Sequence, residues 1–228
     1  MKTAITISGA QRYHHQGLFK LAKQIQNWGE VDLFVRIWKH PEFAQTPEQL
    51  IKLWYEMGLP PEWNFRSVEL LDDQPPHHPP YIPLNLAHWA PNFLTMWWGI
   101  VKSNELRVRY QRQTHAKYDL VFRLRTDSFS STPDVTVDLT DYVELAKTHM
   151  ITGINYSDVF QFGSSELYDK FVGYWDHLKQ LSVSWEFIHP EESLEKYLND
   201  LGIPTGHIPL WIAPHRHGRE YGVRPGDW

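Results

Sequence analysis

The sequence contains no cysteine, which excludes disulfides, thiolate catalysis and cysteine-based zinc sites. It also lacks an excess of positive charge, because 22 Lys and Arg residues against 27 Asp and Glu residues give a net charge of -5 at pH 7. We therefore expect no nucleic-acid partner, since proteins that bind phosphate backbones carry a basic surplus. No apolar run is long enough to span a membrane, and the apolar start of the chain is too short for a signal peptide. These absences favour a cytoplasmic protein.

Motifs of several common enzyme classes are absent as well. The chain has no glycine-rich dinucleotide loop, no P-loop, no G-x-S-x-G nucleophile turn and no H-E-x-x-H zinc motif. Oxidoreductases with nucleotide cofactors, P-loop enzymes and serine hydrolases of the α/β type are therefore disfavoured.

Aromatic residues, in contrast, are abundant. The 228 residues include 11 Trp, 11 Tyr and 11 Phe, which together make up 14% of the chain. Large aromatic rings most often fill protein cores. A surplus of flat rings also suits sugar binding, because such rings pack against the C–H faces of pyranoses. The length fits one domain with a substantial core.

The first third of the chain alternates between the apolar periodicities of strands and helices. Strands are predicted at 3–7, 31–37 and 67–71, and helices at 16–27 and 47–57. This order is typical of an open, mostly parallel sheet wound by helices. The rest of the chain is predicted to form a proline-dense loop at 72–92, helices at 93–115, 164–178 and 190–201, and strands at 118–127, 149–153, 159–162 and 207–213.

The most informative segment is the strand that follows Tyr118. One of its faces is apolar, and the other carries Arg123, Arg125 and Asp127. Charge in a buried strand is costly unless it is paired or functional. Ligands of α/β sheets bind at the carboxyl ends of the strands. Arginines followed by a carboxylate at such an end suit a phosphate, a metal ion or both, and the alternative is a structural ion pair.

Further candidates follow the first two predicted strands. Ser8, Gly9, Gln11 and Arg12 form a predicted turn after the first strand, where a nucleotide can rest close to the backbone. Arg36 ends the second strand. Each arginine suits a phosphate, and each suits a solvated loop equally well.

The remaining candidates are spread over the second half of the chain. Asn104 lies on the predicted buried face of the long helix, where an amide needs partners. Asp158 precedes a strand and can lie beside a bound sugar or cap a turn. Glu191 and Glu192 are either ordinary acids of a first helical turn or include a base that takes a proton from an acceptor hydroxyl. Two histidines in the Arg-rich tail can ligate a metal or bind a diphosphate, namely His215 and His217.

Taken in chain order, these segments resemble a group of small glycosyltransferases from phages, large viruses and bacteria. That group has an S-G-Q-R opening, a helix with an asparagine, a Y-D-V-R-R-D strand, an S-D-F-F-G segment and a P-E-L-Y-L helix. The matching segments here are Ser8–Arg12, the helix around Asn104, Tyr118–Asp127, Ser157–Gly163 and Pro190–Leu198.

The resemblance implies a single type A glycosyltransferase (GT-A) domain, an α/β fold with a Rossmann-like, mostly parallel sheet flanked by helices. Residues 1–128 would form the nucleotide-binding half, and residues 129–228 the acceptor and catalytic half. The implied partners are a nucleoside-diphosphate sugar and a glycan or other hydroxyl acceptor, and the implied cofactor is Mn²⁺ or Mg²⁺. Trp and Tyr residues of 81–98 would line the acceptor side.

The resemblance also implies a role for each candidate residue. Asp127 with His215 or His217 would hold the metal ion, and Glu191, Glu192 or Asp158 would act in catalysis. The residues that would bind the nucleotide sugar are Ser8, Gly9, Gln11, Arg12, Arg36, Asn104, Arg123 and Arg125.

One position departs from the type A pattern. The metal motif of this class is usually Asp-x-Asp, and Arg125 occupies the place of the first acid. A single carboxylate holds a divalent ion loosely without a second ligand. A catalytically silent nucleotide- or glycan-binding protein of the same fold is therefore one alternative. A nucleotidyltransferase is another, although such enzymes usually open with a glycine-rich basic loop, and this chain has Gly9 alone there.

Overall fold

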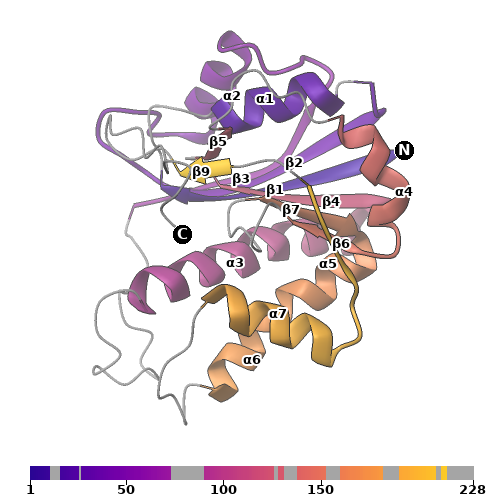
Figure 1. Cartoon of the computed structure of the whole chain (residues 1–228). Coiled ribbons are helices and arrows are strands. Elements are labelled where there is room, and N and C mark those ends of the chain that lie inside the picture. The colour runs from indigo at the N-terminus through magenta and orange to yellow at the C-terminus, as the bar shows by residue number, and fades with distance from the viewer. Residues whose placement is uncertain are drawn as a thin grey trace, which may run out of the picture.

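A seven-stranded sheet with helices on both faces forms the centre of the molecule (Figure 1). The computed structural model describes residues 1–10, 16–25, 27–72, 90–125, 128–130, 138–152, 160–181, 190–208 and 212–214. The strand order is β3-β2-β1-β4-β7-β6-β8, and every strand except β7 runs in the same direction. The prediction of an α/β fold with a mostly parallel, Rossmann-like sheet flanked by helices is confirmed.

The strands of the main sheet are β1 (Lys2–Ala10), β2 (Glu30–Trp38), β3 (Asn64–Leu71), β4 (Leu120–Arg125), β6 (Met150–Thr152), β7 (Phe160–Ser164) and β8 (Thr205–His207). The helices are α1 (Gln16–Ile25), α2 (Pro47–Glu56), α3 (Ala90–Thr114), the 3-10 turn η1 (Leu139–Tyr142), α4 (Val143–Ala146), α5 (Ser165–Val172), α6 (Tyr174–Leu181) and α7 (Pro190–Asp200). A separate two-stranded sheet pairs β5 (Ser128–Ser130) with β9 (Ile212–Pro214).

Local sequence explains where several helices begin and end. Thr46 and Gln49 form a reciprocal capping box at the start of α2, and Pro47 occupies the first turn. Ser164 caps α5, because its hydroxyl accepts a hydrogen bond from the backbone N–H of Leu167. The single helix predicted at 164–178 was wrong, because α5 ends at Val172 with Gly173 as its C-cap, and α6 starts at Tyr174.

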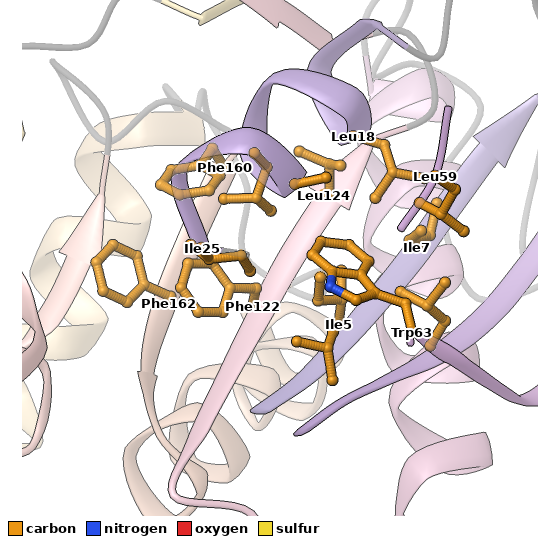
Figure 2. Packing of buried hydrophobic residues seen from close by; sticks show 14 of the residues in the cluster. Ile5, Ile7, Leu18, Ile25, Leu59, Trp63, Phe122, Leu124, Phe160 and Phe162 are labelled. Atoms are coloured by element: carbon orange, nitrogen blue, oxygen red, sulfur yellow. The ribbon is translucent and has the colours of Figure 1, made fainter. Parts of the chain in front are cut away.

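The sheet separates two hydrophobic cores. On one face, α1, α2 and α4 cover a core in which Phe122 and Phe162 stack with ring centroids 4.5 Å apart (Figure 2). On the other face, α3, α5, α6 and α7 cover a second core that includes the edge-to-face pair of Trp97 and Tyr174, 4.6 Å apart. Because both faces are buried, the carboxyl edge of the parallel strands is left as the natural place for a ligand.

Two strand ends differ from the predictions. The predicted turn at Ser8 was wrong, because β1 continues to Ala10 and stays paired with β2 as far as Trp38. Gly9 has a φ of 132° within this extension, a value that residues with a Cβ rarely adopt. The single strand predicted at 207–213 was also wrong, because β8 and β9 belong to different sheets.

Candidate functional site at the carboxyl edge of the sheet

Four polar residues form a row across four neighbouring strands at the carboxyl edge. Glu69 of β3 pairs in register with Arg36 of β2, Arg36 with Ser8 of β1, and Ser8 with Arg125 of β4. Residues in register on parallel strands share a face, and this is the face that α3 covers. We call Glu69, Arg36, Ser8 and Arg125 the outer row. It brings together three of the predicted donor-binding residues.

A second polar row lies on the same face and extends toward β8. Register pairs Thr6 with Arg123, Arg123 with Gln161, Gln161 with Thr152, and Thr152 with His207. We call these five residues the inner row. All of them are buried except His207, and Arg123 is 0% exposed. Arg123 Nη1 donates to Gln161 Oε1 at 3.3 Å, so this hydrogen bond links β4 to β7 within the inner row.

Arg36 is fixed by contacts on two sides. Its Nη1 lies 3.2 Å from Glu69 Oε2, and its guanidinium carbon lies 5.2 Å from the centre of the Trp98 ring on α3. Trp98 in turn stacks on Trp38 with centroids 6.1 Å apart and planes at 30°. A guanidinium held between a carboxylate and an aromatic face keeps one orientation, as phosphate recognition requires.

Helix α3 passes very close to the edge at Gly99. A Cβ at this position would lie 3.3 Å from Ser8 Cβ and 3.4 Å from the Trp38 ring. This close approach leaves the Ser8 side chain only 3% exposed. Trp97, one of the tryptophans predicted to line the acceptor side, is 2% exposed and lies in the core.

Asn104 serves the contact between α3 and α5 in this structure. Its Oδ1 accepts from Arg107 Nε at 2.7 Å, and its Nδ2 donates to Asp169 Oδ1 at 3.3 Å. The fully buried Arg107 also bonds to Asp169 and donates to Ser165 Oγ at 2.8 Å. The prediction that a buried Asn104 has partners is confirmed, and its contact with a nucleotide sugar stays a prediction.

The buried Tyr168 connects the inner row to α5. Thr6 Oγ1 donates to the Phe122 carbonyl at 3.1 Å, so the Tyr168 hydroxyl, 2.8 Å away, donates to Thr6 Oγ1. Burial raises the pKa of Tyr168 to about 12, although the charges of Arg123 and Arg107 oppose that rise. The phenol therefore stays neutral at physiological pH and acts as a donor.

Several predicted site residues lie outside the described part of the chain. These are Gln11, Arg12, Asp127, Asp158, His215 and His217. Glu191 and Glu192 open α7 as predicted, and only their backbone is described. Among the described residues, no group of three His, Asp or Glu side chains has a geometry that could hold a metal ion.

The two-stranded sheet bears on the predicted metal ligands. Ser128 of β5 pairs with Pro214 of β9 in an antiparallel register. Ser128 directly follows Asp127, and Pro214 directly precedes His215. The described pairing therefore joins the two segments that are next to these predicted ligands in the sequence.

Sequence reasoning did not select several members of these rows. Glu69 lies in a segment with the ordinary pattern of a strand, and it was therefore not selected. Gln161 and Thr152 lie in short apolar strands and were not selected for the same reason. The sequence did contain an indication for two of them. Gln161 alternates with Phe160 and Phe162, and Thr152 follows Ile151. In a strand buried on both faces, such an interruption needs a partner.

No family model matches the chain, and no curated protein matches its sequence. A nucleoside-diphosphate-sugar pyrophosphorylase from Vibrio cholerae RC9 has a similar structure, with 10% identity and a TM-score of 0.47 over 90% of this chain and 91% of that chain. A likeness of this degree says nothing about the reaction. None of the described helices has the length and apolar character needed to cross a membrane.

Proposed function

We propose that the chain is a glycosyltransferase that moves a sugar from a nucleoside-diphosphate sugar to a hydroxyl acceptor. The observation that carries this proposal is the outer row, in which Arg36 and Arg125 flank Ser8 at the carboxyl ends of β2, β1 and β4. Guanidinium groups bind phosphate oxygens in pairs and with defined geometry. Two of them at this edge suit a diphosphate, and the buried Arg123 adds positive charge beneath it. The resemblance of the motifs to small glycosyltransferases points the same way.

The proposed metal site supports this reading. Asp127 with His215 or His217 would hold Mn²⁺ or Mg²⁺, and the pairing of Ser128 with Pro214 favours His215. One carboxylate and one or two imidazoles are suitable ligands for Mn²⁺. When bound, the ion would neutralise charge on the departing diphosphate. Arg125, at the position of the first acid of the usual motif, would contribute a second positive charge.

Transfer requires one bond to form and one to break at the anomeric carbon of the sugar. The acceptor oxygen would bond to this carbon as its bond to the diphosphate oxygen breaks, and the nucleoside diphosphate would leave. If the reaction inverts this carbon, the acceptor proton would pass to a carboxylate, for which Glu191, Glu192 and Asp158 are our candidates. Glu191 and Glu192 are in the first turn of α7.

A panel of nucleoside-diphosphate sugars tests the proposal. With Mn²⁺ present, we expect one of them to raise the melting temperature and to release nucleoside diphosphate in the presence of acceptor glycans. Asp127→Ala should weaken the metal-dependent binding of that donor by about tenfold or more, the equivalent of one charge-assisted contact. Isothermal titration calorimetry with and without Mn²⁺ measures this change.

Asp200→Ala is the matched control, because Asp200 is an exposed carboxylate at the end of α7 that pairs with Lys196. It should bind the donor as the unaltered protein does. Donor binding that is the same in Asp127→Ala would refute the metal site. Binding of a donor sugar without transfer to any acceptor would favour the silent binding protein. Formation of the sugar nucleotide from a nucleoside triphosphate and a sugar phosphate would favour the nucleotidyltransferase.

A further inference from the structure

Two polar side chains on the β2 and β3 side of the carboxyl edge are open to a ligand. The outer row offers Arg36 and Glu69 there, and their side chains are 17% and 31% exposed. If the diphosphate lies between β1 and β4, a nucleoside that extends over β2 and β3 can reach both.

The length of the outer row suits an extended nucleoside diphosphate. Glu69 and Arg125 are three strand spacings apart, which is about 14 Å at the usual spacing of neighbouring strands. The side chains between them are those of Arg36, a cation, and Ser8, which α3 covers. A diphosphate bound by the two guanidinium groups beyond Ser8 leaves Glu69 opposite the group attached to the first phosphate, which is the ribose.

Glu69 has the chemistry to accept hydrogen bonds from the hydroxyl groups of a ribose. Its Oε2 lies 3.2 Å from Arg36 Nη1 and its Oε1 lies 3.7 Å from Arg109 Nη1, so the carboxylate is held from both sides. A carboxylate has about four lone-pair positions, and these two contacts leave room for further donors. The neighbouring hydroxyls of a ribose are such donors.

Two buried N–H groups of β2, the strand next to Glu69, are a second indication of a ligand. Arg36 Nε and Trp38 Nε1 make no hydrogen bond to any residue that the structure describes, and Trp38 is only 6% exposed. Both belong to β2 on the face that carries the outer row. Buried donors in native proteins are nearly always matched with an acceptor. Phosphate and base oxygens of a nucleotide are acceptors of this kind.

We infer that Glu69 binds the ribose hydroxyls of the donor and makes the site selective for ribonucleoside diphosphates over their 2′-deoxy counterparts. The inference rests on the proposed function and adds to it the orientation of the donor. The nucleoside lies over the ends of β2 and β3, with Arg36 and Trp98 beside it. The sugar then lies on the β4 side of the edge, toward β7.

Calorimetry with four nucleotides in Mn²⁺ tests the inference: UDP, GDP and their 2′-deoxy forms. We expect the unaltered protein to bind one ribonucleotide about tenfold more tightly than its deoxy form, since one hydrogen bond to a charged group is lost. Glu69→Gln should bind the ribonucleotide and its deoxy form with nearly equal affinity, whatever change in both affinities follows from the altered contact with Arg36. The ratio of the two affinities is the readout, because general loosening of the site lowers both.

Glu105→Gln is the matched control, since Glu105 is a partly exposed carboxylate on α3 that pairs with Lys102. It should keep the full preference for the ribonucleotide. Glu69→Asp, which keeps the charge and shortens the side chain, should keep part of it, and this variant supplies the measurement if Glu69→Gln does not fold.

The outcomes separate the inference from the proposed function. Equal affinity of the unaltered protein for the ribo and deoxy forms overturns the inference and leaves the glycosyltransferase proposal standing. An unchanged preference in Glu69→Gln does the same. If none of the four nucleotides binds, the inference is wrong, and the wider panel of nucleoside-diphosphate sugars decides the proposed function.

Discussion

Replacement of Asp32 by alanine is expected to lower the free energy of unfolding by about 3 kcal/mol. Asp32 is 0% exposed near the start of β2. Its carboxylate accepts from the Tyr118 hydroxyl at 2.6 Å and from Arg66 Nε at 2.7 Å, and Lys2 Nζ lies 3.5 Å away. The substitution leaves the buried phenol without its acceptor and two cations without their shared partner. The loss falls at the low end for a buried ion pair because Arg66 and Lys2 are partly exposed and both keep Glu30.

Urea denaturation at pH 7 measures this change. Tyr118→Phe removes only one of the bonds to Asp32 and should cost about 1 kcal/mol. The cluster lies near the amino ends of the strands, at the opposite edge from the outer row. The folded Asp32→Ala protein should therefore bind nucleotides with unchanged affinity. If Asp32→Ala lowers the free energy of unfolding by less than Tyr118→Phe does, the ion pairs of Asp32 contribute nothing to stability.

Periodicity in the sequence was sufficient for the order of the main elements but not for their directions. The apolar runs in β1, β2 and β4 identified buried strands, since such strands are apolar on both faces. The antiparallel direction of β7 depends on its pairing with β4, and no local pattern encodes that choice. The break between α5 and α6 depends on a distant contact as well, because a Cβ at Gly173 would lie 2.9 Å from the Tyr197 hydroxyl.

The candidate site was predictable to the extent that it depends on strand geometry. A period of two places Arg123 and Arg125 on one face, and the structure agrees. The same pattern cannot show that Arg123 is wholly enclosed whereas Arg125 is partly exposed, because helices supply that cover. Glu69 joins the row only through the register of β2 and β3, which contains an irregularity between Leu33 and Phe34.

The stability of the protein is expected to fall between pH 10 and 12 because of Tyr168. Burial raises the pKa of this phenol from 10.0 to about 12 in the folded protein. Below pH 10 the phenol is neutral in both states, and its contribution to stability is fully present. Between the two values, the unfolded chain ionises while the folded chain must keep the proton. A difference of about two pH units corresponds to about 3 kcal/mol lost over this range.

Tyr168→Phe isolates this contribution, since other tyrosines with raised pKa values, such as Tyr118, titrate in both proteins. At pH 7 the variant should be about 1 kcal/mol less stable, because Thr6 loses the hydrogen bond from the Tyr168 hydroxyl. At pH 12 the order should reverse, because phenylalanine has no proton to lose. Urea denaturation across this range gives the two stability curves, and their crossing is the expected result. Parallel curves would mean that Tyr168 ionises as easily in the folded protein as in the unfolded chain, and that water reaches the inner row at Thr6.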